Sequence, residues 1–282
     1  MSWELLALFA ALCYGAGNLV QKHIMKTENT IVYAWFFNVF SAAFFFLLFV
    51  REASFPPSYI AWLIVLLASS LYVLANVTGL EAYKHTDISV RDPLSKTSVL
   101  FTLIFSMLIL KESLTINKFL GVFLLLIGAV ILAWHKDPLK RISKKGIILT
   151  LINAFLMGLV AVIDKTGLAY FTPAFYGFLV FLFPTMILTP AALGRADRVK
   201  ASFHKMKMPM IAVSLLAAAG YFSQITAYNL TDVSNVAIVV QMSIVISVLG
   251  GYLFHKEGDL IRRLIGALFI IAGTALVIRP FF

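Results

Sequence analysis

Charged residues and cysteine are both scarce in this chain of 282 residues. Asp, Glu, Lys and Arg make up 13% of it, whereas soluble domains average about 25%. The single cysteine, Cys13, excludes an intrachain disulfide and any paired-cysteine metal site. A water-soluble enzyme and a disulfide-built secreted protein are therefore both excluded.

The motifs of nucleotide, metal and nucleophilic chemistry are missing as well. The sequence has no P-loop and no nucleophile elbow, so ATP-driven pumping and acyl-transfer catalysis are not expected. The five histidines are scattered near the ends of apolar runs, without metal-ligand spacing. We therefore expect no enzymatic activity, no cofactor and no metal. The net charge of +10 is better explained by membrane-flanking loops than by nucleic-acid binding.

What the chain has in abundance is apolar length. Hydrophobic residues make up 61% of it, and the mean hydropathy is +0.94. A membrane-spanning helix needs about 20 apolar residues, whereas barrel strands would be about 10 residues long with alternating polarity. The sequence therefore predicts an all-α integral membrane protein with ten transmembrane helices. They are expected at about 3–21, 31–50, 59–80, 87–110, 115–134, 146–164, 174–193, 209–229, 233–254 and 260–278.

Basic residues are divided unevenly between the loops that these runs define. The loops after the odd-numbered runs carry 16 Lys and Arg, and the other loops with the C-terminus carry five. Because basic loops stay in the cytoplasm, this bias favours both termini outside.

The two halves of the sequence repeat each other at an offset of 145 residues. Polar pairs match at this offset, which chance similarity between apolar stretches does not explain. The matches include Thr86-Asp87 with Thr231-Asp232, Lys111-Glu112 with Lys256-Glu257, Ser98 with Ser243, Gly121 with Gly266 and Gly128 with Gly273. Each half holds five runs, an odd number, so the second half enters the membrane from the opposite side. We predict two inverted-topology five-helix repeats, 1–135 and 146–282, joined by a basic linker at 136–145.

In these features the chain resembles the ten-helix EamA-type branch of the drug/metabolite transporter (DMT) superfamily. The resemblance rests on the paired repeats, on Pro93-x2-Lys96-x-Ser98, and on Lys-Glu junctions followed by glycine-bearing helices. It implies a substrate cavity lined by helices 1, 3, 4, 6, 8 and 9. It also implies cytoplasmic termini, against the charge bias, so the orientation stays open. The second half carries Ile238 and Gln241 in place of Pro93 and Lys96, so a role of Lys96 is not expected to be duplicated.

The fourth run holds three charges at membrane depth, Arg91, Asp92 and Lys96. Such charges cost about 2.5–3.5 kcal/mol each on insertion scales and normally face a cavity or a partner. Asp92 and Lys96 share a helix face by i,i+4 spacing. One interpretation is a neutralised pair that steadies a bend at Pro93. The other is that Arg91 and Lys96 bind a carboxylate or phosphate of the substrate, with Asp92 tuning them.

Other polar residues within the runs are either walls of the same cavity or polar contacts between helices. Spacing of i,i+4 places Tyr14 with Asn18, Tyr72 with Asn76, and Gln224 with Tyr228 on shared faces. The candidate substrate-binding residues are Tyr14, Asn18, Tyr72, Asn76, Arg91, Lys96, Tyr221, Gln224, Tyr228 and Gln241. Coupling to protons needs a carboxyl group withdrawn from water. The candidates for that role are Asp92, Glu81 and Asp164.

The sequence thus predicts a secondary transporter that moves a small polar metabolite, such as an amino acid or an organic anion, by alternating access. The alternatives are a flippase or carrier for a lipid-linked or phosphate-bearing substrate and a non-transporting membrane scaffold subunit. The expected partners are the small-molecule substrate and the lipid bilayer, while nucleic acid is not expected. Proton or cation coupling and homo-oligomer formation are left open. The compact chain points to the plasma (inner) membrane of a prokaryote.

Overall fold

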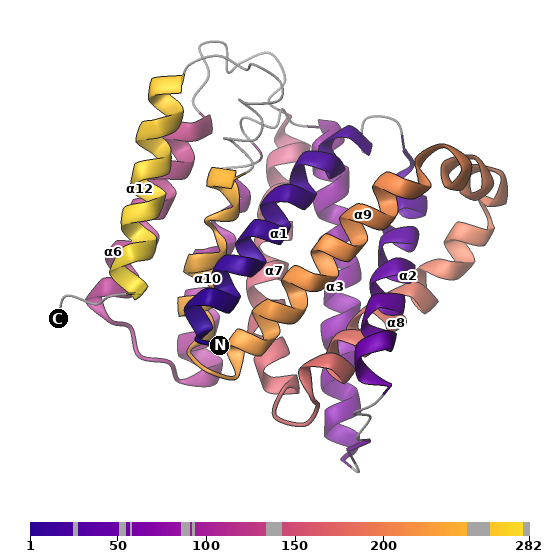
Figure 1. Ribbon diagram of the computed structural model, residues 1–282, viewed down its shortest axis with the longest axis horizontal. Coiled ribbons are helices and arrows are strands. Elements are labelled where there is room, and N and C mark those ends of the chain that lie inside the picture. Colours follow the sequence, from indigo (N-terminus) through magenta and orange to yellow (C-terminus); the bar gives the residue numbers. More distant parts are fainter. Residues whose placement is uncertain are drawn as a thin grey trace.

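The computed structural model describes residues 1–24, 28–50, 55–56, 58–85, 91, 94–133, 143–246 and 260–278. In these residues the regular structure is helical (Figure 1). The elements in chain order are α1 (Trp3–Ile24), α2 (Thr30–Phe49), α3 (Tyr59–His85), α5 (Ser98–Phe105), the π-helix η1 (Ser106–Leu110), α6 (Ile116–Ala133), α7 (Lys144–Gly167), α8 (Pro173–Leu193), α9 (Ala196–Tyr228), α10 (Val233–Val240) and α12 (Leu260–Ile278).

The helices have the length and composition of membrane spans. In the described part of the chain, six helices are long and apolar enough to cross a membrane, namely α1, α2, α3, α7, α8 and α9. Four shorter apolar helical stretches lie at Ser98–Leu110, Ile116–Leu132, Val233–Ile246 and Leu264–Ile278. Each of these ten stretches overlaps one of the ten apolar runs, so the predicted all-α membrane fold is confirmed. The largest difference is at α9, which begins at Ala196 instead of near 209 and so includes basic residues that hydropathy places in a loop.

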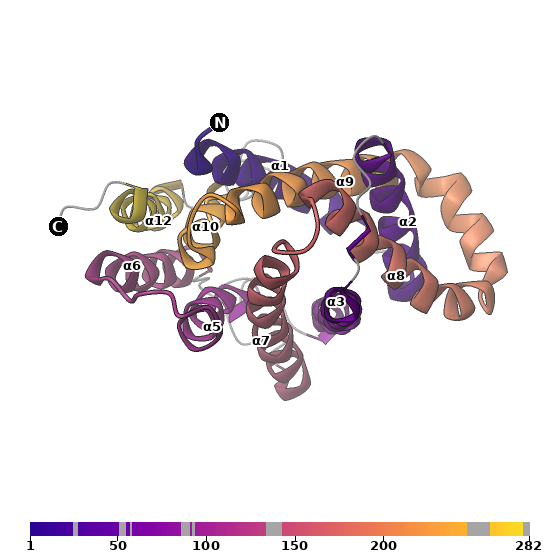
Figure 2. The same ribbon diagram turned by 90° about the horizontal axis from the view of Figure 1, so that it is seen from below.

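The helices of the two halves interleave instead of forming two separate bundles. Figure 2 shows one layer with α12, α10, α1 and α9 and a second layer with α6, α5, α7 and α3. The pair α2 and α8 lies at one end of both layers. In Figure 1, α1 begins at the lower edge of the molecule and α7 ends there, so the two halves cross the molecule in opposite directions.

The contacts between helices follow a two-fold pattern. α1 packs on α9, and its counterpart α7 packs on α3. In the same way α5 packs on α7, and α10 packs on α1. The pairs α2 with α8 and α6 with α12 consist of counterparts that pack on each other. An axis in the membrane plane that exchanges two inverted repeats produces this pattern.

Glycines bring α6 and α12 into backbone contact. A Cβ atom at Gly121 would lie 2.9 Å from the carbonyl oxygen of Gly273, and one at Gly128 would lie 2.6 Å from that of Gly266. The reciprocal distances are 2.5 Å and 2.9 Å. Small residues allow membrane helices to approach this closely. Gly121 and Gly266 are counterparts in the repeat, as are Gly128 and Gly273, so the crossing obeys the two-fold symmetry.

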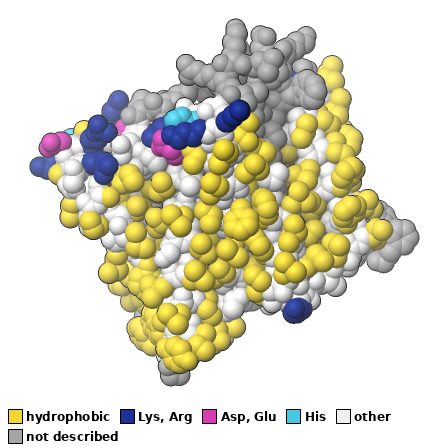
Figure 3. All heavy atoms as spheres, turned by 180° about the vertical axis from the view of Figure 1, so that it is seen from behind, with side chains coloured by type: hydrophobic (Ala, Val, Ile, Leu, Met, Phe, Trp, Pro, Cys, Tyr) yellow, Lys and Arg dark blue, Asp and Glu magenta, His cyan; other side chains and the backbone are white. Residues whose placement is uncertain are grey.

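Charged side chains gather at one end of the bundle. Figure 3 shows most of them along the upper edge, above a broad apolar surface. We call this end the basic face. It holds the end of α3, the start of α7 and the turn between α8 and α9 with the start of α9. The basic residues of these segments are Lys84, Lys144, Lys145, Arg195, Arg198, Lys200, Lys205 and Lys207. The other end, which we call the far face, holds the start of α6, the end of α7 and the turn before α10. The broad apolar surface between the two faces fits the hydrocarbon layer of a bilayer.

Candidate functional site

Two helices are interrupted at positions that are counterparts in the repeat. A turn at Lys96-Thr97 precedes α5, and a turn at Gln241-Met242 follows α10. The N–H groups of Thr97 and Gln241 each donate to the carbonyl three residues earlier, at 3.2 Å. The fourth and ninth runs therefore each contain a local turn with i→i+3 bonding, although Thr97 and Gln241 keep right-handed helical backbone angles. We call these two turns the helix breaks. Departures from regular α-helical bonding at membrane depth occur where the backbone is buried in protein or lines a polar cavity.

Glycines seat two neighbouring helices against the interrupted ones. A Cβ atom at Gly15 in α1 would lie 2.6 Å from Cβ of Ile246. Gly158 in α7, which matches Gly15 at an offset of 143, would place its Cβ 2.6 Å from Cβ of Phe101 in α5. Because both contacts are too close for a larger residue, α1 and α7 flank the two interrupted helices.

A buried carboxylate lies in α7, where three helices meet. Asp164 is 2% exposed. The Tyr176 hydroxyl in α8 donates to its Oδ1 and the Tyr221 hydroxyl in α9 donates to its Oδ2, each at 2.9 Å. Gly167 makes room for this arrangement, because a Cβ atom there would collide with the Tyr176 ring. Each carboxylate oxygen therefore has a hydrogen-bond donor, as buried acids require.

A second chain of hydrogen bonds links α1 to α9. The Tyr14 hydroxyl donates to Oε1 of Gln224 at 2.7 Å, and Nε2 of Gln224 donates to the Tyr228 hydroxyl. Tyr221, Gln224 and Tyr228 follow i, i+3, i+7 spacing and so lie along one face of α9. The structure thus brings four of the predicted binding residues onto or against that face.

Helix α3 adds Tyr72 and Asn76 to the same region. The Phe181 ring lies edge-on to the rings of Tyr72 and Tyr221, at centroid distances of 5.7 and 5.4 Å. Asn76 interacts with the Tyr72 side chain. We call Tyr14, Tyr72, Tyr176, Tyr221 and Tyr228, with Asp164, Asn76 and Gln224, the tyrosine cluster.

The remaining predicted binding residues differ in their surroundings. Asn18, one turn beyond Tyr14, is exposed. Arg91, Lys96 and Gln241 are partly buried. Lys96 and Gln241 form part of the two helix breaks.

Two of the three predicted proton-coupling acids are described by the structure, and they differ in exposure. Glu81 is partly exposed near the end of α3, where its carboxylate lies 2.8 Å from Nζ of Lys84 and 3.4 Å from Nε2 of His85. Asp92 lies outside the described residues. Asp164 is therefore the described candidate that meets the requirement of withdrawal from water.

Sequence reasoning does not single out Tyr176, although it completes the site around Asp164. Its helix, α8, is apolar along most of its length, and no charged residue lies one turn from Tyr176. The partner of Tyr176 is on another helix, and a contact between helices leaves no spacing signal in the sequence. The one local hint is Gly167, whose missing side chain accommodates the tyrosine ring.

The cluster offers hydroxyl, amide and carboxylate groups inside an apolar bundle. Such groups suit hydrogen bonding to a small polar molecule and exchange of a proton at Asp164. Among the described residues there is no group of three or more His, Cys, Asp or Glu side chains placed to hold a metal ion.

Comparison with known proteins identifies the family. The model of the EamA-like transporter family matches residues 1–134 and 144–279, and the chain therefore belongs to this family of membrane transporters. A solved structure described as "Crystal structure of protein" is similar, with a TM-score of 0.79 and 13% identity over 98% of both chains. At this identity the likeness concerns the fold alone. No curated protein matches the chain.

Proposed function

We propose that the protein is a secondary transporter that moves a small polar metabolite by alternating access between its two repeats. The observation that carries this proposal is the pair of helix breaks at Lys96-Thr97 and Gln241-Met242, which are counterparts in an inverted repeat. Inverted repeats allow each half to adopt the conformation that the other half has left, and substrate sites of such carriers lie at broken helices. Residues 1–135 and 146–282 would be the two exchanging units, joined by 136–145.

Lys96 gives the proposed site its preference for anionic groups. One break carries a lysine and the other carries the neutral Gln241, so the site is cationic on one side only. A lysine at this position supplies positive charge, and a carboxylate or phosphate of the substrate forms charge-assisted hydrogen bonds with such a group. We therefore propose an amino acid, an organic anion or a related compound as substrate.

Asp164 is the proposed proton-coupling residue. Tyr176 and Tyr221 donate to its two oxygens from two different helices. A movement that separates α8 and α9 from α7 would remove both donors and leave the carboxyl in an apolar setting. The carboxyl would then take up a proton, which links helix movement to proton binding.

The distribution of charge supports an orientation. Basic loops stay in the cytoplasm, so we propose that the basic face is cytoplasmic and that both termini lie outside. The plasma (inner) membrane of a prokaryote remains the proposed location.

Thermal stability of the purified protein in detergent, measured against anionic, zwitterionic and cationic metabolites, tests the proposal. A ligand at 100 times its dissociation constant stabilises the folded state by about 2.7 kcal/mol. We expect stabilisation by anions or zwitterions in the wild type and in Lys84→Ala, and its loss in Lys96→Ala. Lys84 is a matched control because it is an exposed lysine paired with Glu81.

The other outcomes of this experiment contradict the proposal in different ways. Stabilisation by cations alone would overturn the role of Lys96 and leave Asp164 as the ligand-binding charge. Stabilisation by phospholipid alone would favour a flippase or a carrier of a phosphate-bearing lipid. Absence of any stabilisation would favour a membrane scaffold subunit.

A further inference from the structure

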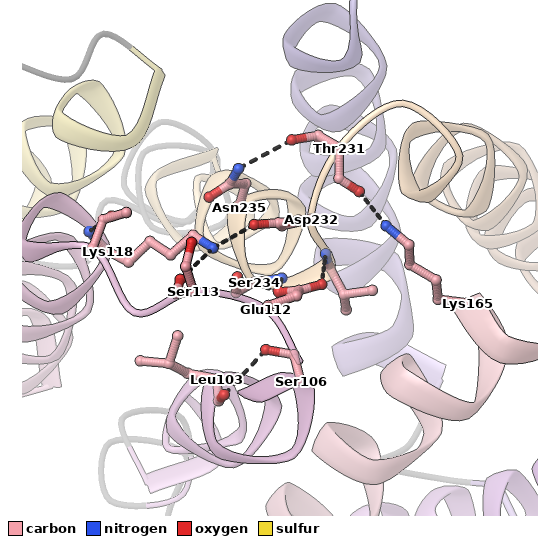
Figure 4. Close-up of polar contacts among 12 residues, drawn as sticks. Leu103, Ser106, Glu112, Ser113, Lys118, Lys165, Thr231, Asp232, Ser234 and Asn235 are labelled. Carbon is pink, nitrogen blue, oxygen red and sulfur yellow. Dashed lines mark hydrogen bonds and ion pairs between the residues drawn. The ribbon is translucent and has the colours of Figure 1, made fainter. Parts of the chain in front are cut away.

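The first turn of α10, at the far face, is held by side chains from three other segments (Figure 4). Glu112 comes from the stretch between η1 and α6, Lys118 from α6 and Lys165 from α7. Glu112 and Lys118 belong to the first half of the chain, whereas α10 belongs to the second. We call these three residues, with Thr231, Asp232 and Ser234, the α10 latch.

Glu112 supplies the N-terminal cap of a helix in the other half. Its Oε1 accepts from the Val233 N–H at 2.6 Å, and its Oε2 accepts from the Ser234 N–H at 3.2 Å and from the Ser234 hydroxyl at 2.6 Å. The start of a helix has free N–H groups and a partial positive charge, which a carboxylate satisfies. Glu112 therefore caps α10 and not α6, the helix that follows it in the sequence.

Asp232, the residue at the N-cap position of α10, makes no capping bond with its own side chain. Its Oδ2 instead lies 2.6 Å from Nζ of Lys118, which also donates to the Ser113 carbonyl at 3.0 Å. Lys165 adds a third attachment by donating to the Thr231 carbonyl at 2.6 Å. The start of α10 is therefore bonded to α6, to the stretch before α6 and to α7.

The chemistry of the latch differs from that of the fixed contacts between the halves. At the crossing of α6 and α12, glycine backbones touch, and such packing has no substitute once the helices separate. In the latch, hydrogen bonds and an ion pair lie at the end of the bundle, where the Asp232 side chain is 39% exposed and the Lys118 side chain is 5% exposed. Water can therefore reach the ion pair from the Asp232 side and replace its hydrogen bonds as the latch opens.

The latch is also next to the proposed coupling carboxyl. Lys165 follows Asp164 directly in α7, so the same helix turn carries the buried acid and a latch residue. A movement of this turn relative to α8, α9 and α10 therefore affects the donors to Asp164 and the bond to Thr231 together.

We infer that the α10 latch is the gate at the far face of the transport path, closed in this structure and opened once in every transport cycle. This inference rests on the proposed function. When the latch is closed, the start of α10 is fixed to the first half, and when it opens, α10 is free to move away and expose the break at Gln241 to the far face. That break lies eight residues beyond the helix start, about 12 Å deeper at 1.5 Å per residue.

Cysteine accessibility tests the gate without any substrate. The native thiol is removed by Cys13→Ser, Gln241→Cys provides the reporter, and a membrane-impermeant maleimide is added to intact cells or to inside-out vesicles. We expect Glu112→Gln to raise the labelling rate from the far-face side about tenfold, because the open state gains population. Lys118→Gln should act in the same direction, and Glu81→Gln, which neutralises a partly exposed acid away from the latch, should have no effect.

Equal labelling rates in the reporter protein and in its Glu112→Gln, Lys118→Gln and Glu81→Gln variants would overturn the proposed gate. Size-exclusion profiles identify a variant that does not fold. If either Glu112→Gln or Lys118→Gln does not fold, the other variant carries the test. Because this readout needs no metabolite, it can fail while transport is found, or succeed while transport is absent. The failures of the gate and of the proposed function are thus distinguishable.

A reversible cross-link separates a gate from a permanent cap. Glu112→Cys with Ser234→Cys, bridged by a short bifunctional methanethiosulfonate, fixes α10 to the first half. The bridged protein should lose proton flux driven by the stabilising metabolite, and reduction should restore it. The control pair, Thr231→Cys with Asn235→Cys, carries the same bridge within one turn of α10, where Asn235 Nδ2 lies 3.0 Å from the Thr231 hydroxyl. Undiminished flux in the bridged Glu112–Ser234 pair would contradict the inference.

Discussion

At the scale of single residues, Asp164 shows how a buried acid is satisfied by neighbours that are distant in sequence. Its two oxygens accept from Tyr176 and Tyr221, which lie 12 and 57 residues further along the chain. The sequence predicts Asp164 and Tyr221 because each is a polar residue in an apolar run. It does not predict their bond, since the register between two apolar helices is set by packing and has no polar periodicity to reveal it.

Tyr176→Phe tests the contribution of one of these hydroxyls. Removing it leaves Oδ1 of Asp164 without this donor, and a buried acceptor that loses its partner costs about 1–3 kcal/mol. We expect the free energy of unfolding to fall by about this amount, read as a lower melting temperature in detergent. Tyr170→Phe is the control, because Tyr170 is partly exposed near the turn after α7. Equal melting temperatures for the two variants would show that the bond to Asp164 does not stabilise the fold.

At the scale of helices, the recurrence of glycines in α6 and α12 is visible in the sequence, but the crossing of these two helices was not predicted. The offset of 145 predicts that Gly121 and Gly128 have counterparts at Gly266 and Gly273. The contacts join Gly121 to Gly273 and Gly128 to Gly266, because counterpart helices in an inverted repeat cross antiparallel. For the fourth run the sequence offers a bend at Pro93 as one interpretation. The turn at Gln241-Met242 was not predicted, because hydropathy averages over many residues and does not reveal a two-residue turn.

Gly128→Ala tests this crossing. In an open helix the change from Gly to Ala stabilises by about 0.5–1 kcal/mol, because alanine loses less backbone entropy. At Gly128 the added Cβ would lie 2.6 Å from the Gly266 carbonyl oxygen, so we expect a lower melting temperature. Gly17→Ala is the matched control, since a Cβ there meets its nearest neighbour, Leu216, at 3.9 Å. A Gly128→Ala protein as stable as Gly17→Ala would contradict the close crossing.

At the scale of the whole molecule, the inverted repeat is the feature that the sequence predicts best. Polar pairs such as Thr231-Asp232 and Lys111-Glu112 match their counterparts at a fixed offset, and an odd number of spans in each half then implies inversion. The interleaving of the halves in two layers could not be predicted (Figure 2). Lipid and protein are equally apolar surroundings for these helices, so no amphipathic stripe indicates which face meets which helix.

Carriers of this architecture work only if both repeats rearrange around one site. We propose that Asp164 links this rearrangement to the binding and release of protons. The most direct measurement is metabolite-driven proton flux in proteoliposomes that contain a pH-sensitive dye, compared between the wild type and Asp164→Asn. We predict that the wild type moves protons when the stabilising metabolite is added. Asp164→Asn should still be stabilised by the metabolite but should move no protons. Unchanged proton flux in Asp164→Asn, or no metabolite-driven flux in the wild type, would contradict the account.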